Sequence, residues 1–569
     1  MAAASALDSL FADYWEFQMR TSPTWATYLG DHRFDDRLSD LSAAERDKEL
    51  QALRGFLARS QAIQEAELAR SDSLSAELFS REIQRQIDDW PLLEYTMPIS
   101  QQNGPHIEFP ELVTYHPFQT VNDCENFVKR LRAFPVLIDQ TIANMQEGMK
   151  DRLVPAKVTM QATVPEIESQ IVDDPAKAVL AGAIAQIDSG IPDTAKARLK
   201  QEIITAIAAD VVPAYQRLDA FVKTEYIPAC RDTVGILALP DGRERYRRLA
   251  RRYTTTNLSP EEIFQIGQRE LKLVHDQMEA IKDSCGFHGT IQEFAASLRQ
   301  DPRFFYTTAD SLVDGFKAIL ARMNDKLPLL FGRLPKAPYS FREIESYRAE
   351  AAPDAYYYGA PEDGSRPGYF YINTSHPTMR PKYTMEALAF HEAVPGHHLQ
   401  LSIQQELTNL PRFRRHGGYT AFVEGWGLYS ERLPKEVGFF TDPYSEFGRL
   451  TLEAWRCVRL IVDPGIHYYG WTRRQAVDFF RDNTALSDLN INSEVDRYIA
   501  WPGQALAYKI GQLKILELRQ KAKDALGSRF DIRAFHDELL ADGALPLDLL
   551  EAKMDRWLAM QVKSAHAGG

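Results

Sequence analysis

The stretch His391-Glu392-Ala393-Val394-Pro395-Gly396-His397-His398 places three imidazoles and a carboxylate within eight residues. A second carboxylate follows at Glu424, in the run Ala421-Phe422-Val423-Glu424-Gly425-Trp426. The whole chain has 13 histidines in 569 residues, so a surface helix that is rich in histidine by chance explains this octet poorly. Two histidines and one glutamate as ligands, an open position for water and a second glutamate as base make up a catalytic zinc site.

The spacing of the histidines departs from the usual His-Glu-x-x-His motif, because position i+4 from His391 is Pro395. The next histidines are His397 at i+6 and His398 at i+7, and on a straight helix i+7 lies roughly 10 Å further along the axis. Proline clashes with the carbonyl four residues back, so the helix must bulge or break here. A widened turn of the π-bulge kind would return His397 to the face of His391. We therefore favour His391 and His397 as ligands over His391 and His398, and expect the remaining histidine to contact substrate or to support a ligand.

The third metal ligand is expected from a helix predicted over Tyr419–Leu433, after the break at Gly417-Gly418. Glu424 lies among apolar residues of this helix, where an unpaired carboxylate is costly to bury and a cation would neutralise it. Glu431 follows seven residues later on the same face. It is either a solvated helix charge or a group that supports a metal ligand from behind.

Four stretches of the chain carry a family resemblance: Gly368-Tyr369-Phe370-Tyr371-Ile372-Asn373-Thr374, the octet extended by Leu399-Gln400, Phe422-Val423-Glu424-Gly425-Trp426, and Arg497-Tyr498 with Pro502-Gly503-Gln504-Ala505. In these the chain resembles a large, mostly bacterial family catalogued as a domain of unknown function. That family is similar to the gluzincin metallopeptidases, above all the mainly helical thimet-oligopeptidase and carboxypeptidase-Taq types. The resemblance extends over essentially the whole chain and implies a zinc peptidase with a helical, clefted fold. Unlike ordinary gluzincins, this chain has two extra residues before the second histidine.

Composition agrees with a globular enzyme, since 44% of the residues are hydrophobic and 25% are charged. A chain of 569 residues exceeds one typical core, so we expect a helical N-terminal lobe over 1–335 and a zincin-like catalytic lobe over 336–569, intertwined as one unit. The net charge of −13 argues against nucleic acid or an anionic membrane as partner. No apolar run is long enough for a membrane span.

The N-terminus lacks the basic region of a secretory signal, and the four cysteines are far apart in the sequence. Buried free thiols in a reducing cytosol are the simplest interpretation of the cysteines, although a trimmed export signal stays open. We therefore expect a cytoplasmic protein.

Apolar residues at helical spacing run through most of the chain. The clearest such segments are Ala43–Ser71, Leu74–Trp90, Cys124–Met149, Thr194–Tyr226, Pro260–Cys285, Ala309–Leu327 and nearly everything after Met385. The sequence therefore predicts a mainly α protein with a zincin-like, two-lobed helical fold, a central cleft and a small antiparallel sheet next to the active-site helix.

The strand signals for that sheet lie at Phe341–Arg348, Ala355–Gly359 and Gly368–Asn373. An exposed edge beside the metal could hold an extended peptide by main-chain hydrogen bonds. Tyr371 and Asn373, which point to one face of the last strand, are then candidates for substrate contact. The alternative is a buried aromatic strand that contributes packing alone.

Two polar clusters downstream could complete the site. Arg459 and Asp463 stand four apart on an apolar helix, which favours an internal ion pair. Asp463 or His467 could instead orient a zinc ligand.

The second cluster surrounds a predicted helix end before Pro502. Arg497, or Arg459 from the first cluster, could bind a substrate carboxylate. The Tyr498 hydroxyl is the first candidate for stabilising an oxyanion and Tyr508 is the second. Gln504 shares a helical face with Tyr508 and is a candidate for substrate contact.

The mechanism that these residues favour is metal-assisted amide hydrolysis, with one zinc ion per chain and Glu392 as general base and then acid. Small or extended peptides are the expected substrates, cut by a carboxypeptidase or an oligopeptidase. Hydrolysis of a non-peptide amide or ester is one alternative. A non-catalytic protein is another, because His391, His397, His398 and Glu424 could just supply the four ligands of a structural zinc. The cleavage direction, the native metal and the oligomeric state stay open.

Overall fold

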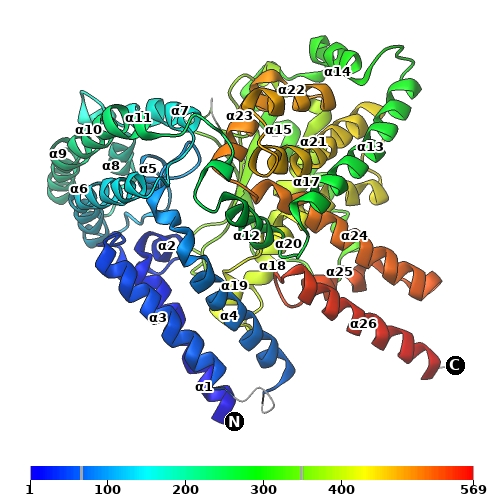
Figure 1. Ribbon diagram of the computed structural model, residues 1–569, viewed down its shortest axis with the longest axis horizontal. Helices are drawn as coiled ribbons and strands as arrows, with labels where there is room; N and C mark the ends of the chain where they lie inside the picture. The colour runs from blue at the N-terminus through cyan, green and yellow to red at the C-terminus, as the bar shows by residue number, and fades with distance from the viewer. Residues whose placement is uncertain (1, 64–67, 346–348, 350–351, 568–569) are drawn as a thin grey trace. The chain divides into compact units, whose positions relative to one another are not determined.

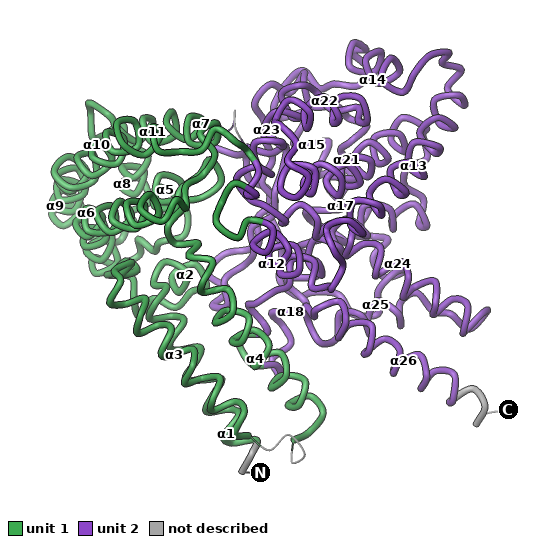
Figure 2. The backbone as a smooth tube through the Cα atoms, in the orientation of Figure 1, with its two compact units in different colours: residues 1–234, 238–242, 411–413 green, residues 235–237, 243–410, 414–569 purple. Residues whose placement is uncertain are grey.

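The computed structural model describes residues 2–63, 68–345, 349 and 352–567, which are mainly helical with one small sheet (Figure 1). The chain forms two compact units, residues 1–234, 238–242 and 411–413, and residues 235–237, 243–410 and 414–569 (Figure 2). The division expected at 335/336 is therefore displaced towards the N-terminus. The reason is that α13 (Pro260–Ser284) packs along α21 (Pro443–His467), which joins the segment after residue 243 to the C-terminal half. The zincin-like arrangement and the central cleft stay predictions.

The described part of unit 1 consists of helices, of which α6 has 30 residues. They are α1 (Ala2–Thr21), α2 (Pro23–Tyr28), η1 (His32–Phe34), α3 (Ala43–Gln61), α4 (Arg70–Asp89), η3 (Trp90–Leu92), η4 (Glu94–Thr96), α5 (Pro105–Tyr115), α6 (Val121–Lys150), α7 (Lys157–Glu168), η5 (Pro175–Lys177), η6 (Val179–Gly182), α8 (Ala183–Gln186), α9 (Asp193–Ala206), η7 (Ile207–Val211), α10 (Val212–Phe221), η8 (Val222–Tyr226) and α11 (Ile227–Ala229).

The predicted helices of unit 1 match these elements closely. The segment predicted over Cys124–Met149 is α6, which begins after a capping box between Thr120 and Asp123. The segment predicted over Ala43–Ser71 corresponds to α3 and the start of α4, and its residues 64–67 lie outside the described residues. All four cysteines are free thiols, and Cys124, Cys230 and Cys457 are buried as expected, whereas Cys285 is only half-buried.

Unit 2 contains the motif residues. Its elements are η9 (Ile236–Ala238), α12 (Gly242–Thr254), α13, α14 (Ile291–Gln300), η10 (Pro302–Phe304), α15 (Ala309–Asn324), α16 (Leu327–Leu330), β1 (Tyr339–Glu343), β2 (Ala355–Tyr358), β3 (Gly368–Ile372), η11 (Pro377–Met379), α17 (Lys382–Glu392), α18 (His397–Gln405), α19 (Arg412–Arg415), α20 (Thr420–Arg432), η12 (Leu433–Val437), α21, α22 (Arg473–Asn483), α23 (Asp488–Ala500), η13 (Gln504–Leu506), α24 (Ala507–Leu526), η14 (Gly527–Arg529), α25 (Ile532–Leu540) and α26 (Leu547–Ala567). Three of these elements cross the division: η9 ends in unit 1, α12 begins in unit 1, and the first two residues of α19 belong to unit 1.

The three strands form a mixed sheet in the order β1-β3-β2. β1 pairs with β3 in parallel, from Tyr339 opposite Gly368 to Glu343 opposite Ile372, and β2 pairs with β3 antiparallel. The predicted all-antiparallel sheet is wrong for β1, because the chain crosses over through β2 before it returns as β3. The predicted strand at Phe341–Arg348 ends at Glu343, and its residues 346–348 lie outside the described residues.

The helices that carry the histidine motif and Glu424 pack against one another. α17 packs against both α20 and α21, α18 packs against α20, and α20 packs along α24. The segments expected to be helical after Met385 and over Tyr419–Leu433 are therefore present, the second as α20.

Candidate metal centre

The histidine motif spans a break between two helices. α17 ends at Glu392 and α18 begins at His397, with a cis Val394–Pro395 peptide bond between them. The predicted π-bulge is therefore wrong, since the helix ends instead of widening. The carbonyl of Pro395, which has no partner within either helix, accepts hydrogen bonds from Trp426 Nε1 at 2.9 Å and Ser430 Oγ at 3.3 Å.

The break brings the chain back on itself at Gly396. A Cβ atom at this position would lie 1.9 Å from the carbonyl oxygen of His391 and 2.3 Å from that of Phe390. Only glycine allows this close return. Because the chain turns back so tightly, the first residue of α18 lies beside the last turn of α17.

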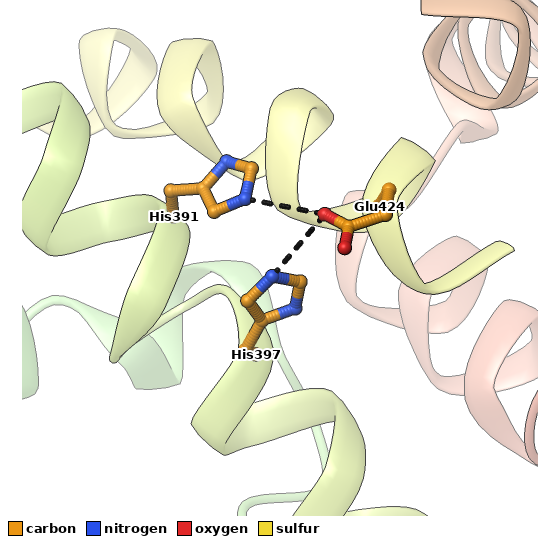
Figure 3. Close-up of side chains that lie close together, drawn as sticks. All are labelled: His391, His397 and Glu424. Carbon is orange, nitrogen blue, oxygen red and sulfur yellow. Dashed lines mark ion pairs between the residues drawn. The ribbon is translucent and has the colours of Figure 1, made fainter. Parts of the chain in front are cut away.

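Three side chains converge at this point. One ligand atom from each of His391, His397 and Glu424 lies within 4.8 Å of the other two. Both imidazoles face the same carboxylate oxygen (Figure 3), with Nε2 of His391 and Nε2 of His397 each 3.5 Å from Glu424 Oε2. The ring planes are perpendicular and their centroids are 4.7 Å apart. These are the three residues that the sequence favoured as metal ligands.

Two observations show that the space between these side chains suits a cation. Glu424 Oε2 is buried and makes no hydrogen bond with any described residue, which is costly for a carboxylate unless a positive charge lies beside it. One turn further along α20, a Cβ atom at Gly427 would lie 2.8 Å from Cε1 of His391 and 3.1 Å from Cε1 of His397. A glycine at this position leaves room for both rings. Two imidazole nitrogens and one carboxylate form a donor set that zinc prefers.

Glu431 contacts one of the candidate ligands, His391, through the ring nitrogen that does not face Glu424. Its Oε1 accepts a hydrogen bond from Nδ1 of His391 at 2.8 Å, which leaves Nε2 of that ring directed at Glu424. Arg456 lies 3.3 Å from the same carboxylate oxygen. Of the two roles considered for Glu431, the structure places it against the ligand, with the side chain only 2% exposed. The spacing of seven residues from Glu424 was the signal for this contact.

His398 contacts the small sheet instead of the three converging side chains. Its Nδ1 lies 2.9 Å from the hydroxyl of Tyr357 on β2, and the rings of Tyr339 and Tyr357 flank it at 4.6 and 5.4 Å. Burial lowers the pKa of His398 to about 4. This histidine therefore belongs to the packing between α18 and the sheet, and the four-ligand site of a structural zinc does not form from these residues.

The charges at the centre favour a cation. Burial lowers the pKa of His391, but contacts with the carboxylates of Glu424 and Glu431 outweigh it and raise that pKa to about 10. Burial raises the pKa of Glu424, and the two imidazoles outweigh it and hold that pKa well below its usual range. The carboxylates thus hold a positive charge at His391, which a metal ion could supply in place of a proton.

Glu392 stands next to His391 at the end of α17. Its side chain is half-buried and has no hydrogen-bond or ion-pair partner among the described residues. Burial raises the pKa of its carboxyl, and the imidazoles of His391 and His397 oppose that shift only in part. Glu392 therefore places a carboxyl group beside His391, and no described residue forms a hydrogen bond or an ion pair with that carboxyl group.

The two candidate tyrosines differ in what holds their hydroxyl groups. Tyr498, the first candidate, donates its proton to Glu494 Oε2 at 2.6 Å and accepts from Arg459 Nε and Trp455 Nε1. It is 1% exposed, so it is a structural residue, and its prediction as oxyanion donor is not supported. Arg459, also buried, pairs with Glu494 at 3.0 Å, so the predicted substrate contact is replaced by an internal ion pair.

The ion pair predicted between Arg459 and Asp463 is wrong as well. Asp463 accepts hydrogen bonds from the Tyr246 hydroxyl at 2.6 Å and from the Gly503 amide at 3.1 Å. His467 contacts the amide of Ile236 and the carbonyl of Tyr498. Neither Asp463 nor His467 orients a histidine of the candidate centre.

Tyr508, by contrast, lies against the centre. Its ring is nearly parallel to that of His391, with centroids 6.2 Å apart. Its hydroxyl oxygen accepts from Arg497 Nη2 at 3.2 Å and from Gln504 Nε2 at 3.5 Å, and no described residue accepts its proton. The guanidinium of Arg459 lies over the ring of Tyr508, 4.3 Å from its centroid. The hydroxyl group of Tyr508 can therefore donate a hydrogen bond to a further group.

The residues predicted to bind substrate on the sheet are buried. Tyr371 is 3% exposed and stacks on Tyr356 with centroids 4.7 Å apart. Asn373 is fully buried, and its amide nitrogen donates to the carbonyls of Ala349, Ala352 and Pro353. Because β3 is the central strand, it offers no free edge, and the packing alternative holds for this strand.

Comparison with known proteins identifies the family. A family model described as "Bacterial protein of unknown function (DUF885)" matches residues 23–554. The chain belongs to this family. No curated protein matches the chain.

Two solved structures are similar to this DUF885 protein. One is described as "the putative lipoprotein from Colwellia psychrerythraea", with 27% identity, a TM-score of 0.94 and coverage of 98% of this chain and 99% of that one. The other is "a putative lipoprotein of unknown function from Shewanella oneidensis", with 20% identity, a TM-score of 0.73 and coverage of 97% and 100%. The second shows a shared fold alone. Within the described residues, no helix has the length and apolar character needed to cross a membrane.

Proposed function

We propose that this DUF885 protein is a zinc-dependent hydrolase that cleaves amide bonds in small or extended peptides. The observation that carries the proposal is the convergence of His391, His397 and Glu424 on one point, with a buried carboxylate oxygen that no described residue hydrogen-bonds. The resemblance of the motif to gluzincin metallopeptidases supports the same reaction class. These three residues would hold one zinc ion.

Three protein ligands favour a catalytic site over a structural one. A structural zinc takes four protein ligands, whereas a catalytic zinc takes three and keeps a position for water. His398, the fourth candidate, faces Tyr357 on β2. The non-catalytic alternative therefore lacks its fourth ligand among the residues of the motif.

In the proposed reaction, Glu392 supplies the proton transfers. When bound, zinc would act as a Lewis acid that lowers the pKa of water and polarises a carbonyl group. The Glu392 carboxylate accepts the proton of the attacking water and later gives it to the departing amine. It suits this task because it adjoins His391 and no hydrogen bond or ion pair with a described residue occupies it.

Tyr508 supplies the hydroxyl group that stabilises the oxyanion. Its hydroxyl oxygen accepts from Arg497 and Gln504, so its own proton can be donated to the oxyanion that develops on the substrate. We assign this role to Tyr508 instead of Tyr498, whose proton is bound by Glu494.

The cytoplasmic location expected from the sequence gains no support from the comparisons. The similar structure from Colwellia psychrerythraea is described as a putative lipoprotein, and a lipoprotein is held at a membrane by its lipid anchor. We include a location in the cell envelope in the proposal. Substrates would then be peptides that arise outside the cytosol.

The experiment that tests the proposed function is a hydrolysis screen. Zinc-loaded protein is incubated with a library of peptides of about three to twelve residues, and products are identified by mass spectrometry. We expect new peptide termini that disappear after removal of the metal with a chelator and return with zinc. Cleavage of amide and ester model compounds without cleavage of any peptide would favour a non-peptide substrate.

A further inference from the structure

Arg497 is a cationic side chain beside the candidate centre that keeps unused donors. Its Nη2 donates to Gln504 Oε1 at 2.7 Å and to the Tyr508 hydroxyl at 3.2 Å, and its Nη1 lies 3.4 Å from Glu494 Oε1. Its Nε has no acceptor among the described residues. With 18% of the side chain exposed, part of this guanidinium is in contact with solvent.

The position of Arg497 is fixed relative to the candidate metal ligands. It contacts the hydroxyl of Tyr508, and the ring of Tyr508 lies nearly parallel to that of His391. Arg497 is thus one residue removed from a metal-binding imidazole. A group bound by Arg497 would lie close to the bond that the centre attacks.

The two neighbouring arginines lack this access. Arg459 is 2% exposed and is held by Glu494 and Tyr498, and Arg456 is 5% exposed and lies against Glu431. Among the three, Arg497 alone has a side chain that is more than one-tenth exposed. The sequence left Arg459 and Arg497 as alternative candidates for binding a substrate carboxylate. The exposure of the side chains favours Arg497.

The charges around Arg497 leave a positive excess. Glu494 is the carboxylate that pairs with both Arg459 and Arg497, so two guanidinium groups share one negative charge. The remaining polar neighbours, Gln504 and Tyr508, are neutral. A cluster with this imbalance, largely shielded from water, attracts an anion.

We propose that Arg497 binds a carboxylate of the substrate and that the enzyme therefore cuts peptides close to their C-terminus. This inference rests on the proposed hydrolase function. A guanidinium matches a carboxylate in geometry as well as charge, and the contact would hold the scissile carbonyl between Glu392 and Tyr508. An acidic side chain next to the scissile bond offers the same chemistry, so the test must separate the two sources.

The test measures binding instead of turnover. Zinc-loaded protein with Glu392→Gln, which should not hydrolyse the probes, is titrated calorimetrically with acetyl-Leu-Phe, with acetyl-Leu-Phe-amide and with acetyl-Leu-Glu-amide. We expect the free acid to bind about tenfold to a hundredfold more tightly than its amide, as the loss of a charge-assisted hydrogen bond implies. The side-chain acid should resemble the amide. Tighter binding of acetyl-Leu-Glu-amide would keep the carboxylate site and assign it to an acidic side chain.

Variants at Arg497 complete the test. Adding Arg497→Gln should abolish the preference for the acid, and Arg497→Lys should restore only part of it, because ammonium lacks the planar fork. The matched control is Arg474→Gln in α22, a 90% exposed arginine that pairs only weakly with Asp478. It should leave the preference unchanged.

Two results would overturn the inference. One is equal affinity for acid and amide, including no binding of either, and the other is a preference that survives Arg497→Gln. Failure of the proposed function gives a different pattern. A preference for the acid that depends on Arg497, in a protein that hydrolyses no peptide, would contradict the hydrolase function and leave the carboxylate site intact.

Discussion

Glu431 Oε1 lies 2.8 Å from Nδ1 of His391, and both side chains are almost fully buried. This contact keeps a proton on Nδ1 of the imidazole, because a carboxylate can accept a hydrogen bond but cannot donate one. The other nitrogen, Nε2, faces the space shared with His397 and Glu424, and its lone pair becomes available there when a metal ion displaces the second proton. Carboxylate–histidine pairs of this kind commonly orient metal ligands.

The contact predicts a loss of metal affinity when Glu431 is changed. Glu431→Gln can accept a hydrogen bond but carries no charge, so zinc affinity should fall by about 10- to 100-fold. Competition with a chelator measures this affinity. Glu517→Gln, an exposed position of α24, is the control. Unchanged affinity for Glu431→Gln would show that the contact does not tune His391.

Glu392 should be needed for turnover and not for metal binding. Glu392→Gln keeps the size of the side chain and removes the proton acceptor, so kcat should fall by about 10² or more. Zinc content and thermal stability should stay close to those of the wild type. A variant that retains its activity would remove Glu392 from the mechanism.

His397 and His398 should respond in opposite ways to replacement by alanine. His397→Ala removes one of the three proposed ligands and should lose bound zinc. His398→Ala should keep zinc and lose stability, because it removes the hydrogen bond between His398 and the Tyr357 hydroxyl and opens a cavity beside Tyr339. Metal analysis and thermal unfolding of both variants check this. Loss of zinc in His398→Ala alone would contradict the arrangement of the two histidines.

The two tyrosines should separate catalysis from stability. Tyr508→Phe removes the available hydroxyl proton and should lower kcat by roughly 10²–10³, the effect of losing one oxyanion donor. Tyr498→Phe should instead lower the free energy of unfolding by about 1–3 kcal/mol, because Glu494 and Arg459 each lose a buried partner. Steady-state kinetics and denaturant unfolding distinguish the effects. If Tyr498→Phe reduced kcat more than Tyr508→Phe, the assignment would be reversed.

Local sequence patterns predicted the helices and the converging side chains well. The density of histidines, the proline between them and the apolar surroundings of Glu424 are local signals, and they point to the three side chains that come together. Proline indicated that the helix could not continue, but a broken helix and a widened one have the same signal. The difference depends on α20, whose Trp426 and Ser430 bind the carbonyl at the break.

Contacts between distant segments could not be predicted in this way. Arg459 and Asp463 have ideal spacing for an ion pair, yet Glu494 from α23 pairs with the arginine and Tyr246 binds the aspartate. The same glutamate takes the proton of Tyr498, which made the less favoured Tyr508 the better candidate. The antiparallel direction predicted for the first strand is wrong for a similar reason, since residue patterns identify strands and do not specify which strands pair.

The zinc content of the purified protein tests the central claim most directly. Protein produced with zinc in the medium, then dialysed against metal-free buffer, is analysed by mass spectrometry for metal per chain, beside Glu424→Ala. We predict one zinc per wild-type chain and a loss of most of it in the variant, because the carboxylate that neutralises the centre is gone. A wild-type chain without metal, or equal zinc in both proteins, would contradict a metal centre at His391, His397 and Glu424.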